Sequence, residues 1–453
     1  MTHYQSVQAA EADVNIYVAE MRFFRALEYF NKIQLLGDVP WLEVDLNVDS
    51  EELYGPKMKR NQVFQKIIED LDFAIQWLPE AGSEEANRLN KDIARHVKAR
   101  FCLNEGTHYK YHDELEYASE AEKWLQMAAT ESDKLITSGR YEIYNTGHPQ
   151  EDYFNMYRID DKSDLKEAVL YVDYKTNIRE HNMAAAGREA GCGFSKSFVE
   201  SFLCSDGLPI SLSNKYLGDE TMRKETANRD PRLKQLILTN DFPTNVTDDL
   251  KDSTFVVNED EFITQHCFTG YRPIKGFNPI YSQALYMKSS FDGIAYRYAE
   301  TLLINAEAKA ELNTITNADL DRTVNQLRDR VGMPHLTVNV GFTDPKWPDW
   351  GYSLSPILQE IRRERCIELA GEGFRFNDLK RWKAGKVLNN VLTYVGKRKP
   401  DGNLAIVYPN YTNPDLSYQA GKSRTWEDKM YLYPIPTGEL QRNPQLLPQN
   451  PGW

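Results

Sequence analysis

The chain has 453 residues, of which 41% are hydrophobic and 27% charged, so it can bury a sizeable core and is not globally disordered. Its formal net charge of -13 argues against a surface for nucleic acid or for anionic lipid. Five scattered cysteines without a CxxC pair argue against a disulfide framework or a cysteine metal cluster, and no apolar run is long enough to predict a transmembrane helix.

Amphipathic helices are predicted through the first 140 residues. In each of them apolar side chains recur at helical spacing along one face. Glycine or proline follows three of them, as Gly37 does after the first. The expected helices cover residues 8–36, 61–78, about 90–101 and about 119–137.

The composition and periodicity of the sequence change after residue 140. Residues 141–289 are rich in Gly, Pro, Asn and Asp and contain only short strand-like runs such as Glu167–Tyr174. Helices resume at Arg297, and a Thr316-x-x-Asp319 pattern predicts a capped helix start. We expect a mostly α fold in which tetratricopeptide-like helix pairs form a scaffold. The scaffold would support a large, irregular, variable subdomain that contains short strands. The expected parts are 1–140 (helical), 141–290 (variable, ligand-binding), 291–390 (helical) and 391–453 (a loop-rich tail).

A charge cluster lies in the helix predicted to begin at Ser355. Arg365 occupies a position on its apolar face, so the guanidinium needs a carboxylate partner. Glu364, Glu368 and Glu372 are the nearest candidates. The cluster is typical either of an acid/base site or of a buried ion-pair network. We favour the network, in which Arg365, Glu368 and Glu372 join two helices.

Motifs for catalysis or cofactor binding are weak throughout the chain. There is no phosphate-binding glycine loop, HExxH or GxSxG motif, so we expect no enzyme activity, no cofactor and no metal. His108 and His112 are spaced for a shared metal on a helix, but no clear third ligand follows. With 67 acidic residues, a glycosidase pair of carboxylates stays open as an alternative.

Aromatic residues in loops are the stronger indication of a binding site. Such rings stack on sugar faces while neighbouring polar groups bind hydroxyls, although each ring can equally pin its own loop to the scaffold. The candidate ligand-binding residues are Trp41, Tyr153, Tyr271, Arg272, Phe277, Trp347, Trp350 and Trp426.

Seven segments, in order along the chain, resemble the SusD/RagB family of surface glycan-binding lipoproteins of Bacteroidetes. The most specific are NQLRDRVG at 325–332, the Glu364–Trp382 stretch with its ER-x-x-EL-x-x-EG pattern, and the ending Tyr433–Trp453. The others are Ala19–Trp41, the DGLPI run at 206–210, the NRDPRL run at 228–233, and Arg297–Leu312.

The resemblance implies a non-catalytic protein that captures oligosaccharides or polysaccharides at the cell surface. It would deliver them to a SusC-like, TonB-dependent outer-membrane transporter, anchored in the outer membrane through a lipidated N-terminal cysteine. This sequence shows neither a signal peptide nor that cysteine, so we expect it to lack part of the usual N-terminal region. A peptide-binding lid of the same kind of transporter, a glycoside hydrolase and a plain helical-repeat scaffold remain the alternatives.

Overall fold

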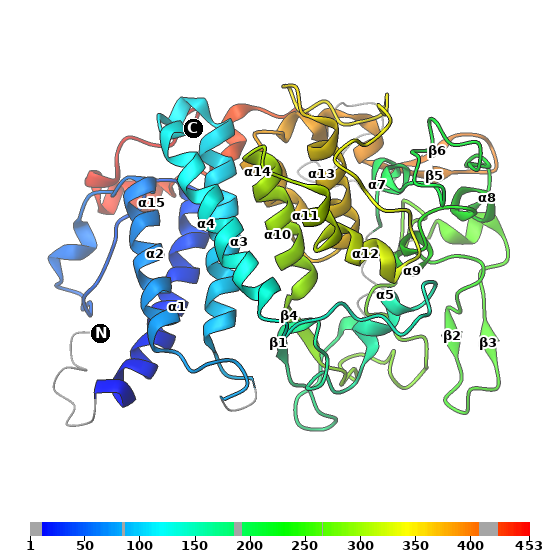
Figure 1. Cartoon of the computed structure of the whole chain (residues 1–453), viewed down its shortest axis with the longest axis horizontal. Helices are drawn as coiled ribbons and strands as arrows, with labels where there is room; N and C mark the ends of the chain where they lie inside the picture. The colour runs from blue at the N-terminus through cyan, green and yellow to red at the C-terminus, as the bar shows by residue number, and fades with distance from the viewer. Residues whose placement is uncertain (1–10, 84–86, 185–192, 265, 407–424) are drawn as a thin grey trace. The chain divides into compact units, whose positions relative to one another are not determined.

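The computed structural model describes residues 11–83, 87–184, 193–264, 266–406 and 425–453 (Figure 1). Among these, the residues up to Leu135 together with Lys380–Gly385 and Trp426–Trp453 form one compact unit. Ile136–Leu379 and Lys386–Thr425 form a second unit. This division differs from the four expected parts, because the tail contributes to both units. The irregular segment and the later helices share the second unit, where long-range strand pairing and buried ion pairs join them.

The first unit is built from long helices. Helix α1 packs on α2, and α2 packs on α3. Stacked rings of Phe30 and Phe101, with centroids 3.6 Å apart, fill the space between α1 and α3. Asn90 caps α3 by accepting a hydrogen bond from the Ile93 N–H. The helices are α1 (Glu11–Leu36), α2 (Arg60–Trp77), α3 (Lys91–Tyr111), α4 (Ala118–Thr137) and α15 (Thr437–Arg442), with 3-10 turns η2 (Glu51–Tyr54), η3 (Asp113–Leu115), η8 (Asp428–Tyr431) and η9 (Pro444–Leu446).

The second unit combines short helices with the later scaffold helices. Helix α10 packs against α13 and α12. Its helices are α5 (Asp152–Asn155), α7 (Lys196–Ser201), α8 (Met222–Thr226), α9 (Arg232–Leu236), α10 (Tyr298–Glu311), α11 (Asn317–Asp321), α12 (Val324–Arg330), α13 (Pro356–Glu368) and α14 (Arg375–Arg381), whose last two residues are grouped with the first unit. Its 3-10 turns are η4 (Met156–Arg158), η5 (Glu259–Phe262), η6 (Gly385–Asn389) and η7 (Val391–Thr393).

Strands are short and pair locally or at long range. In the described residues they make three two-stranded antiparallel sheets. The first pairs β1 (Ala168–Val172) with β4 (Gly293–Arg297), so the predicted run at 167–174 is confirmed as a strand. The others are β2 (Asn245–Val246) with β3 (Ser253–Thr254), and β5 (Val395–Arg398) with β6 (Leu404–Ile406). The predicted fold class, mostly α with short strands, is confirmed.

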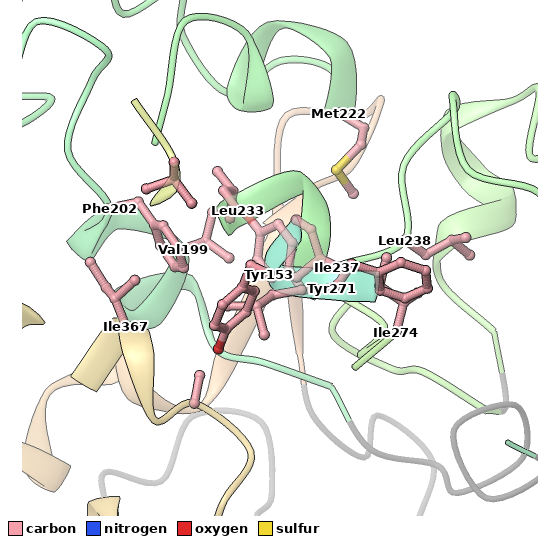
Figure 2. Close-up of a cluster of buried hydrophobic side chains, with 14 of the residues drawn as sticks. Tyr153, Val199, Phe202, Met222, Leu233, Ile237, Leu238, Tyr271, Ile274 and Ile367 are labelled. Carbon is pink, nitrogen blue, oxygen red and sulfur yellow. The ribbon is translucent and has the colours of Figure 1, made fainter. Parts of the chain in front are cut away.

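A hydrophobic cluster ties the irregular segment of the second unit to its helices (Figure 2). Val199 and Phe202 come from α7 and its C-terminal end, Leu233 from α9, and Ile367 from α13. Each is at least 97% buried. Because these residues come from three distant parts of the sequence, the loops between them are held at fixed positions despite having little regular structure.

Candidate functional site

Three of the predicted ligand-binding rings belong to that buried cluster. Tyr153, Tyr271 and Phe277 have 0–2% of their surface exposed. The hydroxyl of Tyr153 donates to the Glu368 carbonyl oxygen at 2.7 Å, and the hydroxyl of Tyr271 donates to the Glu225 carboxylate at 2.8 Å. The prediction that these rings contact ligand is corrected here, because a ring without accessible surface offers no face for stacking.

The two tryptophans of the 344–352 loop are anchored to α13. The indole N–H of Trp347 donates to Glu360 Oε1 at 2.7 Å, and that of Trp350 donates to Gln359 Oε1 at 2.6 Å. Trp350 is buried, with the Arg362 guanidinium 5.0 Å from its ring centroid. The structure therefore assigns Trp350 to packing rather than to ligand stacking, and it leaves Trp347 half-buried.

The remaining candidates are partly exposed and lie in different places. Arg272, half-buried in the second unit, has its guanidinium 5.4 Å from the ring centroid of Phe277. Trp41, in the first unit, packs on Tyr29 with a centroid distance of 4.2 Å, and its indole N–H donates to Glu43 at 2.8 Å. Trp426, also in the first unit, lies over Gly385, where an added Cβ would collide with its indole. These three side chains remain candidates for ligand contact.

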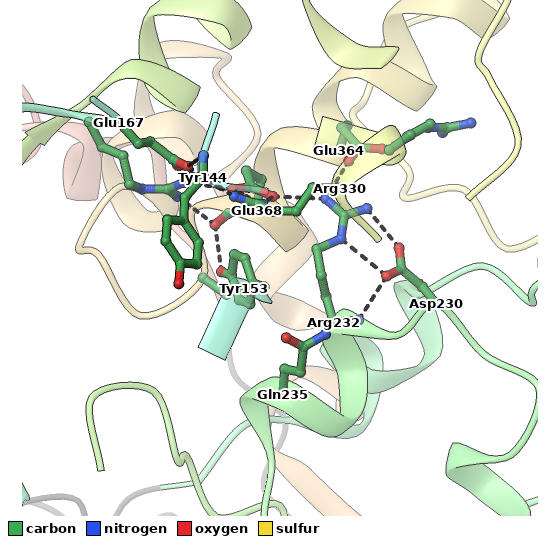
Figure 3. Close-up of polar contacts among 12 residues, drawn as sticks. Tyr144, Tyr153, Glu167, Asp230, Arg232, Gln235, Arg330, Glu364 and Glu368 are labelled. Atoms are coloured by element: carbon green, nitrogen blue, oxygen red, sulfur yellow. Dashed lines mark hydrogen bonds and ion pairs between the residues drawn. The ribbon is translucent and has the colours of Figure 1, made fainter. Parts of the chain in front are cut away.

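The predicted acidic cluster is an ion-pair network centred on Glu368 (Figure 3). Its carboxylate accepts hydrogen bonds from Arg330 at 2.6 Å, Arg297 at 2.6 Å and Arg232 at 2.9 Å. Glu372 accepts from Arg297 at 2.6 Å. Burial raises the pKa of Glu368, but the three guanidinium charges outweigh burial and hold that pKa well below its ordinary value.

Arg365 pairs with none of the three glutamates expected for it, Glu364, Glu368 and Glu372. Its Nε donates to Asp378 Oδ2 at 2.9 Å, and Glu307 lies 3.8 Å away. Arg365 therefore joins α13 to α14 and α10, while Glu368 and Glu372 join α13 to arginines of other segments. Sequence spacing pointed to the nearby glutamates and could not identify these partners, because Asp378 is 13 residues away on another helix and Glu307 lies on α10.

Exposed apolar side chains occur in several places of the second unit, Val257 and Leu250 among them, and six lie on two neighbouring loops at 178–183 and 281–287. We call this set the tyrosine surface; Ile178 is 81% exposed, Tyr286 75%, Met183 54%, Tyr281 49%, Met287 43% and Leu285 40%. The loops pair where the N–H of His181 donates to the Ser289 carbonyl at 2.9 Å, and the Met287 N–H donates to Asn182 Oδ1 at 3.1 Å. A concentration of exposed apolar side chains of this kind marks a binding surface.

A partly buried, hydrogen-bonded base supports the tyrosine surface. The His181 ring lies between Tyr174 and Phe291, with both centroid distances 4.6 Å and both contacts edge-on. Burial lowers the pKa of His181, and its Nε2 lies 2.9 Å from the Phe291 carbonyl oxygen. Asp292 accepts hydrogen bonds from the N–H groups of Tyr174 and Lys162. The exposed rings therefore stand on a fixed support, as a preorganised binding surface requires.

The β2–β3 hairpin supports the other side of this surface. The Tyr281 N–H donates to the Val246 carbonyl at 2.9 Å, and the Ser282 N–H donates to Asp248 Oδ1 at 2.9 Å. Met287 has φ of 55°, a left-handed conformation that is uncommon for a side chain of its size. A strained backbone conformation of this kind persists only where the surrounding contacts hold it in place. Such positions are concentrated at functional sites.

The histidine pair considered for metal binding is packed instead. His108 and His112 stack with centroids 4.0 Å apart in the first unit, and His112 Nε2 lies 2.8 Å from the Lys380 carbonyl oxygen. Burial lowers the pKa of His108 well below its ordinary value. Within the described residues, no group of three or more His, Cys, Asp and Glu side chains is arranged to hold a metal ion.

The sequence analysis missed Tyr281 and Tyr286, although one signal for them was present. The segment YSQALYMK at 281–288 carries two tyrosines and no helical or strand periodicity, at the end of the irregular region. Tyr271 and Phe277, a few residues earlier, lie in a segment of similar composition, so composition alone does not distinguish the two segments. Whether a loop ring is buried depends on contacts with distant segments such as Glu225, which composition does not contain.

Comparisons with known proteins agree on the family. The SusD family model matches residues 135–453, well over half of the chain. The chain belongs to the SusD family. Among curated proteins it is 25% identical over 456 residues to "SusD-like protein P2" of Formosa agariphila, covering 98% of this chain and 75% of that protein.

Solved structures share the fold at lower identity. A SusD-like protein from Bacteroides fragilis superposes with a TM-score of 0.72 at 24% identity, covering 99% of this chain and 82% of that one. A "SusD-like carbohydrate binding protein" from the same species gives 0.71 at 22% identity, with 98% and 83% covered. "Surface glycan-binding protein A" from Bacteroides fluxus gives 0.59 at 18%, with 99% and 80% covered. In the described part of this chain, no helix has the length and apolar character needed to span a membrane.

Proposed function

We propose that this protein binds oligosaccharides or polysaccharides at the tyrosine surface without cleaving them. The observation that carries the proposal is the pair of exposed rings, Tyr281 and Tyr286, on a hydrogen-bonded base in a chain of the SusD family. Aromatic faces bind the C–H faces of sugar rings, and the amide and hydroxyl groups of Asn182 and Ser282 beside them suit sugar hydroxyls. The names of structural neighbours from Bacteroides fragilis and Bacteroides fluxus, which mention carbohydrate or glycan binding, support the same ligand class.

The state of Glu368 argues against one catalytic role. A glycosidase needs one carboxyl group that stays protonated to act as a general acid. Glu368, at the centre of the ion-pair network, is buried and held ionised by its arginines, so it does not meet this requirement. Incubating the purified protein with labelled oligosaccharides should release no product. Product formation that a single Asp or Glu substitution abolishes would contradict this part of the proposal.

The role we propose in the cell is delivery of the captured glycan to a SusC-like, TonB-dependent transporter, with the protein held at the outer-membrane surface by a lipid anchor. Membership of the SusD family supports this role. Co-purification of the protein from its source cells with a TonB-dependent receptor would test it. A full-length protein recovered only from the cytoplasm would contradict it.

Affinity electrophoresis tests the tyrosine surface directly. Tyr286→Ala should weaken retardation by the polysaccharide that retards the wild type, by about tenfold in affinity or ~1.4 kcal/mol, because one stacking face is lost. Tyr17→Ala is the matched control, since Tyr17 is 64% exposed on α1 of the first unit. Equal retardation of the wild type and Tyr286→Ala would refute the assignment of the site, and no retardation by any neutral polysaccharide of a broad panel would refute the function.

A further inference from the structure

A concave site lies in the second unit, on residues that do not belong to the tyrosine surface. It is a cavity of about 490 Å³ between the segment after α4 and the start of α10 with α11–α12. This volume is within the range of about 300–1,000 Å³ that is typical of small-molecule sites. Its walls contain two tyrosines, two isoleucines and a rim of polar side chains.

The floor of the cavity is aromatic. Tyr141 and Tyr298 stack with ring centroids 5.8 Å apart and an interplanar angle of 28°. Tyr298 is buried, while Tyr141 retains accessible surface, as does the neighbouring Ile143. Burial raises the pKa of Tyr298 to about 12, with the nearby Arg322 charge acting in the opposite direction. The Tyr298 hydroxyl therefore stays protonated at neutral pH and is a permanent hydrogen-bond donor beside Arg322.

The charged side chains on the rim of the cavity are paired with other side chains of the protein. Glu142 is paired with Lys166 at 2.8 Å, and Asp329 Oδ1 lies 2.7 Å from His335 Nε2. With Arg322 also on the rim, positive and negative groups balance locally, so the cavity has little net charge to attract an ionic ligand. Each carboxylate still has oxygen lone pairs that can accept a hydroxyl hydrogen.

A stiff support lies behind the cavity. The Tyr298 N–H donates to the Glu167 carbonyl oxygen at 2.8 Å, and the Glu167 carboxylate accepts from Arg297 at 2.9 Å and from the Tyr144 N–H at 2.7 Å (Figure 3). The same carboxylate lies 3.4 Å from Arg330, a member of the Glu368 network. The cavity wall is thus continuous with the most firmly paired part of the unit, and little ordering is needed on binding.

We propose that this cavity is a second saccharide site, which takes a neutral mono- or disaccharide. An aromatic floor with amide, carboxylate and guanidinium groups around it supplies both the stacking face and the donors and acceptors that a sugar ring needs. Local charge balance favours a neutral sugar over a uronate or a charged peptide. The inference does not rest on glycan binding at the tyrosine surface, and it stands or fails separately.

Saturation-transfer NMR with maltose, cellobiose and xylobiose as probes tests the second site. At least one probe should bind the wild type, and Tyr141→Ala should weaken its binding about tenfold. Gln326→Leu keeps the side-chain size while removing the rim amide, and we expect about threefold weaker binding. Because Gln326 is a half-buried residue of α12, this second variant tests the site even if the Tyr141 variant folds poorly.

The control separates this proposal from the first one. Tyr286→Ala should leave disaccharide binding in the cavity unchanged while weakening retention by polysaccharide. Binding that survives both cavity variants, no binding of any probe by the wild type, or preferential binding of D-glucuronate or a Gly-Tyr dipeptide would each overturn the assignment.

Discussion

At the scale of single residues, Glu368 is the carboxylate on which three buried arginines converge. It has no exposed surface and accepts hydrogen bonds from three arginines that come from α9, the start of α10 and α12. Removing one partner of such a group leaves the others buried without compensation, which costs far more than the pair itself contributes.

Replacing Glu368 by Gln should therefore destabilise the protein by about 3–5 kcal/mol. The neutral amide leaves the Arg330 and Arg297 guanidiniums without their main counter-charge. Urea unfolding followed by circular dichroism would measure the change. Glu439→Gln is the matched control, because Glu439 forms an exposed pair with Arg442 that should contribute at most about 1 kcal/mol. Similar losses in the two variants would contradict the role assigned to Glu368.

At the scale of elements, the stability of short helices in the second unit depends on the hydrogen bonds made at their ends. Helix α11 has only five residues, and Thr316 and Asp319 form a reciprocal capping box at its start. The Asp319 carboxylate also accepts from Lys309 at 2.6 Å, which joins this cap to the end of α10. A helix this short cannot be stable by propensity alone, so the cap and its packing determine whether it forms.

Thr316→Ala should lower the free energy of unfolding by about 1 kcal/mol, because the Asp319 N–H loses its side-chain acceptor. Thr130→Ala on the exposed face of α4 is a suitable control, since its hydroxyl bonds only to the Gln126 carbonyl within the helix. Thermal unfolding of both variants would compare them. An equal effect at the two positions would show that the capping box adds nothing.

At the scale of the whole molecule, the net charge of -13 coexists with carboxylates that are tightly paired. Burial raises the pKa of Asp219, but hydrogen bonds from Arg398 and Lys196 outweigh burial and lower that pKa to about 2. The same balance lowers the pKa of Glu372, which is paired with Arg297 and Lys275. These carboxylates bind protons more readily in the unfolded chain than in the folded one.

Stability should therefore be fully present above about pH 4.5 and fall as the pH drops from there towards 2. Stability falls with falling pH because a carboxylate whose pKa is lower in the folded state than in the unfolded state binds a proton more readily in the unfolded state. Asp219→Asn should flatten the pH dependence of the free energy of unfolding. Between about pH 4 and 2 the variant should lose about 1 kcal/mol less than the wild type, after allowance for the partial exposure of Asp219. Urea unfolding at pH 7, 4.5, 3.5 and 2.5 would measure it. A variant with an unchanged slope would contradict the pairing assigned to Asp219.

Much of the scaffold could be predicted from local sequence. The helices near residues 8–36, 61–78 and 119–137 and the helix after Ser355 follow from apolar spacing and capping residues, which act within a few turns. The capping box at Thr316 and the strand near 168–172 were also within reach of short-range patterns. The family follows from ordered motifs along the chain, which the match over residues 135–453 confirms.

Only the tertiary structure decided which aromatic rings are exposed and which charges are paired. Tyr271 and Tyr286 look alike in sequence, yet one hydroxyl is bound by Glu225, 46 residues away, and the other ring is open to solvent. Arg232 finds its partner Glu364 across 132 residues. Burial and ion pairing are properties of contacts between distant segments, and neither periodicity nor composition records them. For this protein the sequence therefore determined the scaffold and the family, whereas long-range packing decided where a ligand can bind.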